Sequence, residues 1–460
     1  MSIFKGRADQ SPPLTQGPVA RRILSFALPL FFGQLLQQLY NLADAWVLGN
    51  FASNEAFAAV SSGGSLTFLI IGFFNGTAVG GGVVISRYYG AGEGEEENVV
   101  RAIHTNFLFG IIASVLSTVV GLLLVPRLLV LMNTPETVLP HALTYFRIYF
   151  GGVFTVILYN ICMAIMQSLG DSLHPLYYLM VSSVLNMGLD LLFVAVLQWG
   201  VAGAAVATVL TQGFSFLLCL WRMCHLKDYT RLDFGKLRLY PDILIQVLRQ
   251  GLPTGVQNAV ISVGNIAVQS NINAFGQYAM SGQGAYAKIE GMVFLPISSL
   301  SMALPTFISQ NLGARQYERA KKGAAFGILS GMVLAELVGV AFLFAAPPAL
   351  RFFVSEPEAI RFGAIHARVV APFFFLLAFS HCAAGVLRGC GRSFVPMATM
   401  LAFWCCVRVV YVTLAVRAFP VFQTISWAYP LTWSLSSVVF LIFLLKSDWL
   451  HTFDIGKPQP

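Results

Sequence analysis

Long apolar segments recur through the whole chain and constrain its fold more than any other feature. A helix needs roughly 20 apolar residues to cross about 30 Å of hydrocarbon, because it rises 1.5 Å per residue. The segments of about this length are residues 23–50, 57–87, 102–126, 140–166, 173–198, 201–222, 243–274, 285–312, 322–347, 362–388, 394–417 and 424–445. The 460 residues are 57% hydrophobic and 10% charged, more apolar surface than a water-soluble fold could bury. We therefore predict an all-α polytopic membrane protein with twelve transmembrane helices.

Similar sequence patterns occur in both halves of the chain. ISRYYGAGEGEEENVVRA at 85–102 is similar to ISQNLGARQYERAKKGA at 308–324, and AIMQSLGDSLHP at 164–175 is similar to GVLRGCGRSFVP at 385–396. The offsets, about 223 and 221 residues, are nearly constant, as is typical of transporters with internal repeats. We predict two pseudo-symmetric six-helix lobes, at 23–222 and 243–446, joined by a cytoplasmic linker at 223–242. An N-terminal segment at 1–22 and a tail at 447–460 complete the chain.

Basic residues concentrate in alternate loops, and cytoplasmic loops are the ones that retain an excess of lysine and arginine. On one side these residues are Lys5, Arg7, Arg21, Arg22, Arg87, Arg101, Lys227, Arg231, Lys236, Arg238, Arg315, Arg319, Lys321, Lys322, Arg388, Arg392, Lys446 and Lys457. On the other side they are Arg127, Arg351, Arg361 and Arg417. This distribution predicts that both termini are cytoplasmic, which requires an even number of crossings.

Acidic residues are rare inside the predicted spans, where we find Asp44, Asp190, Glu290 and Glu336. A carboxylate at membrane depth costs at least about 2.5–3.5 kcal/mol on insertion scales, so it usually has a function. Glu336 has no visible partner in its span, and a functional and a structural role stay equally open. Glu290 and Lys288 lie two positions apart and do not face each other well. We expect them to snorkel from the outer end of their span, while Lys288 stays a candidate for lining a substrate cavity.

The two aspartates lie in the first predicted lobe with amides on the same helical faces. Gln37 and Asn41 precede Asp44 by seven and three residues, and Asn186 precedes Asp190 by four, spacings that put each set on one face. Other spans of this lobe carry polar groups that could converge with them, namely Thr208, Tyr145 and Asn160. The alternative is a structural role, in which each aspartate only bonds a neighbouring helix.

A pocket of two acids with amides and hydroxyls suits a proton or Na⁺. A carboxyl group in a water-poor place ionises less readily, and it can exchange its proton with water when access changes. Oxygen ligands also suit a hard cation. The one metal ion considered is thus Na⁺ at Asp44, Asn186 and Asp190, and no cofactor beyond H⁺ or Na⁺ is expected. Arg408, in the second lobe, could line a cavity or form a salt bridge there.

The chain resembles the MATE family of multidrug and toxic compound extrusion transporters, in particular its prokaryotic branch of DNA-damage-inducible-type members. The segments that carry this resemblance are FALPLFFGQLLQQLYNLADAWVLG, GGGVVISRYYGAGE, QSLGDSLHPLYY, LNMGLDLLFV, GVAGAAVATVLTQ, PTFISQNLGARQYERAKKG, GVLRGCGRSFVP and RVVY. The resemblance implies twelve helices in two lobes and antiport of organic, often cationic, amphiphiles against H⁺ or Na⁺. We also expect a monomer in the inner (plasma) membrane of a bacterial cell, surrounded by lipid and without a nucleic-acid partner.

By this resemblance, the cation site of the first lobe consists of Asp44, Gln37, Asn186, Asp190 and Thr208, with Tyr145 and Asn160 nearby. Some relatives also use acids in the seventh and tenth spans, where this chain has none. The resemblance therefore implies a cation site in the first lobe alone.

The preferred function is secondary active multidrug efflux by alternating access between the two lobes. The alternative is a flippase for lipid-linked oligosaccharides, which belongs to the same superfamily and usually needs a strongly basic cavity; only Lys288 and Arg408 are candidates for one here. An integral-membrane enzyme would need a catalytic cluster such as His and Asp at an interface. No such grouping is visible in the sequence, so we expect a transporter and no enzyme.

Overall fold

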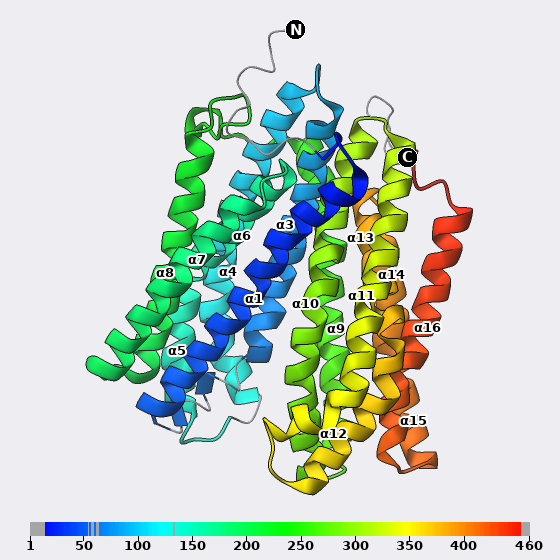
Figure 1. The fold of residues 1–460 in the computed structure, drawn as a ribbon. Coiled ribbons are helices and arrows are strands. Elements are labelled where there is room, and N and C mark those ends of the chain that lie inside the picture. Colours follow the sequence, from blue (N-terminus) through cyan, green and yellow to red (C-terminus); the bar gives the residue numbers. More distant parts are fainter. Residues whose placement is uncertain (1–13, 54, 57–58, 61–63, 132–133, 452–460) are drawn as a thin grey trace. The chain divides into compact units, whose positions relative to one another are not determined.

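Every regular element in the described part of the chain is a helix (Figure 1). The computed structural model describes residues 14–53, 55–56, 59–60, 64–131 and 134–451. Most of the predicted N-terminal segment and tail, with Lys5, Arg7 and Lys457, and the start of the second predicted span lie outside these ranges.

The helices of the first half follow the predicted spans closely. They are α1 (Val19–Phe51), α3 (Gly64–Ala91), α4 (Glu96–Leu131), α5 (Leu139–Gly151), α6 (Val153–Ser168), α7 (Leu173–Asp190), the π-helix η2 (Leu191–Val196) and α8 (Gly200–Cys224). In the second half they are α9 (Pro241–Asn273), α10 (Gln277–Gly313), α11 (Tyr317–Arg351), α12 (Pro357–Val370), the 3₁₀ turn η4 (Ala371–Phe373), α13 (Phe374–Gly389), α14 (Phe394–Met400), the π-helix η5 (Leu401–Val407), α15 (Arg408–Ala418) and α16 (Phe422–Lys446). A short 3₁₀ turn, η3 (Phe234–Lys236), lies in the linker between the halves.

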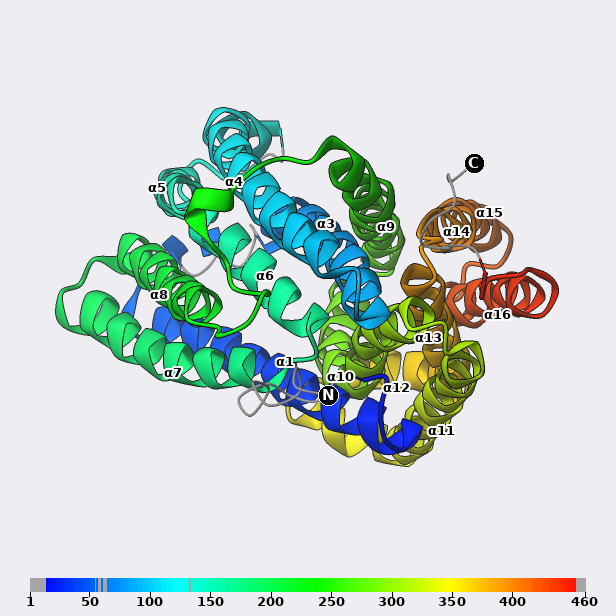
Figure 2. The same ribbon diagram turned by 90° about the horizontal axis from the view of Figure 1, so that it is seen from above.

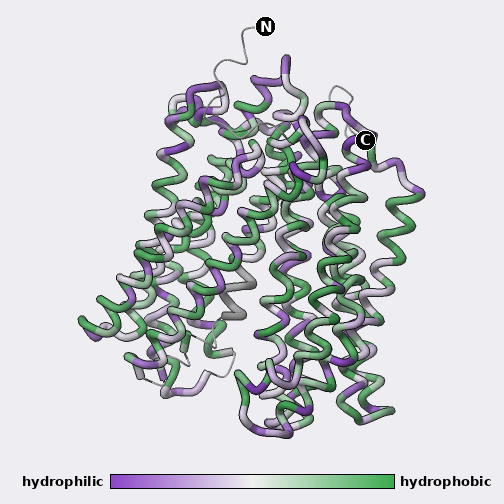
Figure 3. The backbone as a smooth tube through the Cα atoms, in the orientation of Figure 1, coloured by the Kyte–Doolittle hydropathy of each residue, from purple (hydrophilic) through white to green (hydrophobic). Residues whose placement is uncertain are grey.

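These helices give the twelve predicted spans. In the described residues, nine continuous segments are long and apolar enough to cross a membrane, and the bent pair α5–α6 makes a tenth. The helices α3 and α9, with 28 and 33 residues, complete the set, since about 20 residues suffice. Val184, Phe344 and Leu445 are each more than 70% exposed, as expected of side chains that face lipid. Figure 3 shows hydrophobic residues through much of each helix, with hydrophilic ones more frequent near the helix ends.

The same local irregularities occur at the same places in both halves. The fourth span is broken between α5 and α6, with a bend of 47°, and the tenth is broken between α12 and α13 by the turn η4. The fifth and eleventh spans each contain a π-helix, η2 and η5. The sequence repeat therefore extends to the backbone.

Some predicted boundaries are wrong. The helix α10 begins at Gln277, eight residues before the predicted start of the eighth span, because the polar and small residues of its first turns interrupt the apolar pattern without interrupting the helix. This places Glu290 well inside the helix, and not near its outer end as expected.

The chain folds into two compact units. One is Phe32–Gly255, and the other combines Leu14–Phe31 with the chain from Val256 onward. The borders fall inside α1 and α9, so the first turns of α1 belong to the second unit and the first turns of α9 to the first. Within the first unit α7 packs on α8 and α4 on α5 (Figure 2); within the second, α10 packs on α11, α12 and α13.

Glycines bring α3 and the start of α9 into close contact inside the first unit. A Cβ at Gly80 would lie 2.3 Å from the backbone nitrogen of Gly251, and one at Gly76 would lie 2.3 Å from that of Gly255. Small residues allow two membrane helices to approach in this way. The glycines at these positions of α3 therefore serve helix packing.

Candidate functional site

The helices α1 and α7 bring the two predicted aspartates together around one amide. Asp44 lies on α1, and Asn186 and Asp190 lie one turn apart on α7. The amide of Asn186 faces both carboxylates, and its nitrogen, assigned to this side because only acceptors lie there, donates to Asp44 Oδ1 at 2.8 Å and to Asp190 Oδ2 at 2.9 Å. The opposite end of this amide lies 3.5 Å from the hydroxyl of Thr211 on α8. Asn186 thus holds the two acids in one place.

The two carboxyl groups also interact electrostatically with each other, since one amide atom of Asn186 lies within 2.9 Å of both. An ionised carboxylate only accepts hydrogen bonds, so a bond between two such groups requires that one of them carry a proton. Asp190 is 1% exposed, and its Oδ1 accepts no hydrogen bond from the described residues. A buried oxygen without a donor is costly, and a proton or a cation between the acids would remove this cost.

Hydroxyl groups extend the cluster on one side. The Tyr40 hydroxyl donates to Thr208 Oγ1 at 3.3 Å, and Tyr40 interacts electrostatically with Asp44. Tyr145 is close enough to interact electrostatically with Tyr40 and both aspartates. We call the set of Tyr40, Asp44, Asn186, Asp190 and Thr208 the aspartate cluster.

The aspartate cluster has no basic partner. In the ranges that the structure describes, no lysine, arginine or histidine forms an ion pair with Asp44 or Asp190. The described residues also contain no group of three or more His, Cys, Asp or Glu side chains that could hold a metal ion. Oxygen donors with two acids fit a hard monovalent cation better than a transition metal. For Na⁺, Asn186 would have to present its oxygen to the site, whereas for a shared proton it would present its nitrogen.

The other predicted site residues of this half lie apart from these contacts. Gln37 and Asn41 are exposed on α1. The Asn160 amide nitrogen donates at 2.8 Å to the Val156 carbonyl oxygen in its own helix, and not to either aspartate. Tyr40 and Thr211 are the polar contacts that sequence reasoning missed. Tyr40 precedes Asp44 by four residues, so helical spacing could have found it.

The second unit contains a separate buried polar cluster around Arg408. Arg408 is 2% exposed, and its Nε and Nη2 donate to Thr432 Oγ1 at 3.2 and 2.9 Å. Its guanidinium carbon lies 4.7 Å from the ring centre of Tyr429 and 5.4 Å from that of Trp404, as in cation–π contacts. The sequence left two roles open for Arg408, lining a cavity or forming a salt bridge. The structure shows polar and aromatic contacts for this side chain, and no ion pair at salt-bridge distance within the described residues.

Glu290 does not snorkel, contrary to expectation. Its Oε1 accepts a hydrogen bond from the Tyr286 hydroxyl at 3.3 Å, and it interacts electrostatically with Arg408. Since α10 starts earlier than predicted, this carboxyl group lies among the buried side chains of the second unit. Lys288 is exposed, with Nζ 5.6 Å from the ring centre of Phe353.

Glu336 has a structural partner that the sequence did not reveal. Its Oε2 accepts a hydrogen bond at 3.3 Å from the backbone nitrogen of Phe375, in the first turn of α13 after the break η4. The first turns of a helix leave backbone N–H groups without partners, and a negative charge there is favourable. This contact favours the structural role for Glu336.

Comparison with protein families gives a match over both halves. A family model described as MatE matches residues 29–192 and 253–414. The two matched segments begin about 220 residues apart, the offset of the internal repeat.

Similar proteins carry names that refer to drug resistance. A "Probable multidrug resistance protein YpnP" of Bacillus subtilis is 27% identical over 395 residues, 85% of this chain and 87% of that protein. A "Probable multidrug resistance protein NorM" of Thermotoga maritima is 24% identical over 409 residues, 88% of this chain and 86% of that protein. Among solved structures, an outward-facing "multidrug resistance MATE family transporter of the MOP superfamily" matches with a TM-score of 0.89 at 21% identity, over 96% of this chain and 98% of that chain. This last likeness establishes the twelve-helix fold.

Proposed function

The chain belongs to the MatE family, and from this premise we propose that it exports small organic molecules by antiport against H⁺ or Na⁺. The names of its relatives support multidrug transport. The single observation that carries the ion coupling is the geometry of the aspartate cluster, in which two acids share one amide and have no basic partner. The protein would act as a monomer in the bacterial inner membrane, with both termini cytoplasmic.

Coupling requires that the ion and the substrate prefer different states of the transporter. The aspartate cluster joins α1 to α7 and α8, so its charge affects how these helices pack. With a proton or Na⁺ present, the two acids can stay close together. With both acids ionised and no cation present, their repulsion opposes this packing. Ion binding therefore favours one arrangement of the first lobe, and substrate binding favours another.

The amide of Asn186 would serve the two coupling ions in opposite orientations. A proton between Asp44 and Asp190 leaves the amide nitrogen free to donate to both carboxylates. Sodium would instead require oxygen ligands, and Asn186 supplies one when its amide presents its oxygen to the acids. The two ions thus make different demands on one side chain, and an experiment can separate them.

Arg408 and its aromatic neighbours are proposed to contribute to substrate recognition in the second lobe. Buried Arg408 between Tyr429 and Trp404 makes this lobe less anionic than a purely cation-selective exporter would need. We therefore propose that the substrates are organic and amphiphilic, and that they are not restricted to cations.

Efflux of ethidium from proteoliposomes under imposed pH and Na⁺ gradients tests this function, with the wild type beside Asp190→Asn. We expect the wild type to accumulate or release ethidium according to one of the two gradients. Asp190→Asn should lose this dependence while it still inserts into the membrane, because one of the two acids can no longer ionise. Gradient-independent movement in the wild type would contradict antiport and favour facilitated or flippase-like transport.

A further inference from the structure

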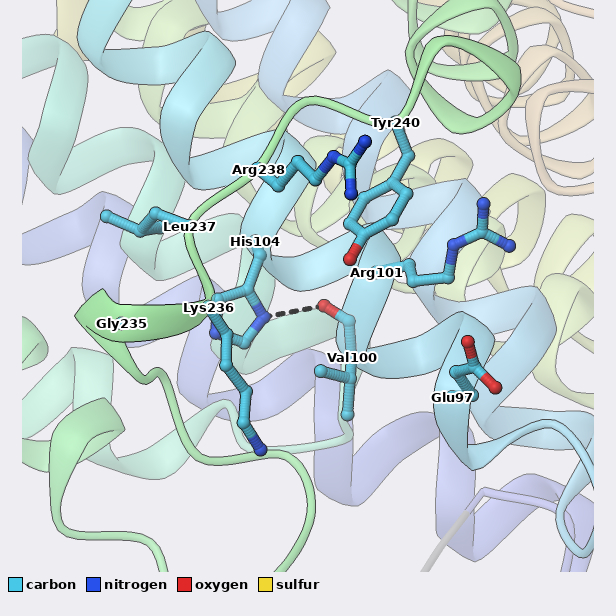
Figure 4. Close-up of a pocket in the computed structure, with 9 residues that line it drawn as sticks. All are labelled: Glu97, Val100, Arg101, His104, Gly235, Lys236, Leu237, Arg238 and Tyr240. Atoms are coloured by element: carbon cyan, nitrogen blue, oxygen red, sulfur yellow. Dashed lines mark hydrogen bonds between the residues drawn. The ribbon is translucent and has the colours of Figure 1, made fainter.

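A cavity lies where the linker between the two halves folds back on the start of α4, within the first unit. Its volume is about 530 Å³. It is lined by Glu97, Val100, Arg101, His104, Gly235, Lys236, Leu237, Arg238 and Tyr240, and we call it the linker pocket (Figure 4). A volume of this size is within the range of sites for small molecules and cofactors. The aspartate cluster does not contribute to it.

Backbone and side-chain contacts hold the linker pocket in shape. His104, 1% exposed, donates from Nδ1 to the Val100 carbonyl oxygen at 2.7 Å, and its Nε2 accepts from the backbone nitrogen of Asp233 at 3.1 Å. Thr105 Oγ1 accepts from the backbone nitrogen of Tyr240 at 3.2 Å. Two consecutive side chains of α4 thus fix both ends of the linker segment that carries the basic residues.

Positive charge exceeds negative charge in the linker pocket. Within the described residues, neither Lys236 nor Arg238 forms an ion pair. Arg101 shares its charge with Asp242, with Nη2 3.3 Å from Oδ1, and Glu97 is the one acidic residue in the lining. Three cations therefore face one carboxylate in the lining, and two of the three are free to bind an anion.

An aromatic ring orders the two arginines. The guanidinium carbons of Arg101 and Arg238 lie 4.4 and 5.8 Å from the ring centre of Tyr240, and Figure 4 shows both side chains beside this ring. Such stacking leaves the edge of a guanidinium available for hydrogen bonds and limits its rotamers. An arginine fixed in this way loses less conformational entropy when it binds a phosphate. Its guanidinium can then donate two parallel hydrogen bonds to the phosphate oxygens.

We propose that the linker pocket binds the phosphate group of an anion at the membrane surface, through Arg238, Lys236 and Arg101. The charge pattern predicts that this end of the helices faces the cytoplasm. Anionic lipids give that leaflet a negative surface and attract basic groups near the ends of membrane helices. A lipid phosphodiester and a free phosphate offer the same chemistry to these side chains, and the experiment distinguishes them.

The test measures binding of two probes to the purified full-length protein in neutral detergent. Native mass spectrometry follows phosphatidylglycerol against zwitterionic phosphatidylcholine, and calorimetric titration follows inorganic pyrophosphate. We expect at least one anionic probe to bind, and Arg238→Gln to weaken its binding about tenfold, because a charge-assisted hydrogen bond is lost. Lys236→Gln should have a similar effect, and Arg238→Lys a smaller one. Added salt should weaken binding in every case.

Lys227→Gln is the matched control. It removes the same charge from an exposed position on the same linker, outside the lining of the linker pocket, and we expect an affinity within about twofold of the wild type, as for a remote surface charge. Loss of phosphatidylglycerol binding in Arg238→Gln and not in Lys227→Gln supports a lipid ligand. The same pattern with pyrophosphate alone supports a soluble one. Equal binding of both probes by wild type, Arg238→Gln and Lys236→Gln, or an equal loss in the control, would overturn the proposal.

Discussion

Asn186 is the residue on which the geometry of both aspartates depends. Its amide nitrogen serves Asp44 and Asp190 together, at 2.8 and 2.9 Å, and it is 1% exposed. Without this amide, each carboxylate loses one hydrogen-bond donor. A hydrogen bond to a charged group contributes about 1.5–3 kcal/mol. We therefore propose that the amide sets how far apart the two acids stay and how readily they take up a cation.

Replacing Asn186 by alanine should reduce ion-coupled efflux by about tenfold or more, because the bonds that hold the two acids in register are lost. The yield of protein in the membrane should stay near that of the wild type. The control is Asn271→Ala, which removes an amide that bonds at 3.0 Å to the Ala267 carbonyl within its own helix. Initial rates of ethidium efflux from proteoliposomes check both variants. Equal rates for Asn186→Ala and the wild type would show that the amide has no part in coupling.

Helical spacing was enough to predict the central residues of the candidate site. Asp44 and Asp190 stand out because acids are rare at membrane depth, and Asn186 lies one turn from Asp190. Spacing could not show that Asn160 bonds inside its own helix, because its carbonyl partner carries no sequence signal. It also could not find the contact of Glu336 with Phe375, 39 residues further along the chain, which depends on the helix break at η4.

Among the helices, α3 and α9 approach each other closely through paired glycines. Gly80 and Gly251 approach so closely that an added Cβ would meet backbone at 2.3 Å. Backbone cannot move aside as the end of a long side chain can. Any side chain at these positions must therefore push the two helices apart.

Gly80→Ala should lower the free energy of unfolding by about 1–3 kcal/mol, the usual cost of overpacking. The comparison is Gly284→Ala in α10, where a Cβ meets nothing within 4 Å and alanine favours the helix. Thermal unfolding in detergent, followed by the fraction of protein that stays monodisperse, separates the two. If Gly80→Ala proves as stable as Gly284→Ala, the close contact of α3 and α9 is wrong.

The lengths of the helices were more predictable than their interruptions. Apolar runs of about 20 residues reveal a span because the thickness of the bilayer fixes the length that must be apolar. The π-helices η2 and η5, by contrast, add one residue to a turn inside otherwise apolar segments. One of them begins directly after Asp190, and the other ends directly before Arg408. Nothing in the apolar pattern marks such a turn, although π-helical turns often lie next to functional residues.

For the whole molecule, the sequence repeat predicted two similar halves, and both halves show the same breaks in their fourth and fifth spans. The borders of the compact units inside α1 and α9 were not predictable, since a continuous helix carries no signal for the partner against which each turn packs. The six-helix lobes at 23–222 and 243–446 therefore stay a prediction, drawn from the sequence repeat. The compact units are defined differently, by which helical turns pack together.

The predicted orientation can be tested with single cysteines on the two sides of the membrane. Lys227→Cys lies in the linker and Glu136→Cys in the turn between α4 and α5, and both positions are exposed. The background replaces Cys224, Cys405 and Cys406 by serine, because the other cysteines are buried. An impermeant maleimide should label Glu136→Cys in intact spheroplasts and Lys227→Cys only in inverted vesicles, because the basic linker stays in the cytoplasm. The reverse pattern would invert the topology.

The most direct test of the account is to count the ions that substrate binding displaces from the aspartate cluster. Purified protein in weakly buffered detergent is titrated with tetraphenylphosphonium while pH is recorded, and a parallel sample carries radioactive Na⁺. We predict that the wild type releases close to one proton, or one Na⁺, for each substrate bound, and that Asp44→Asn binds substrate and releases neither. Release of the same number of ions by Asp44→Asn, or substrate binding to the wild type without any release, would contradict the assignment of the aspartate cluster as the coupling site.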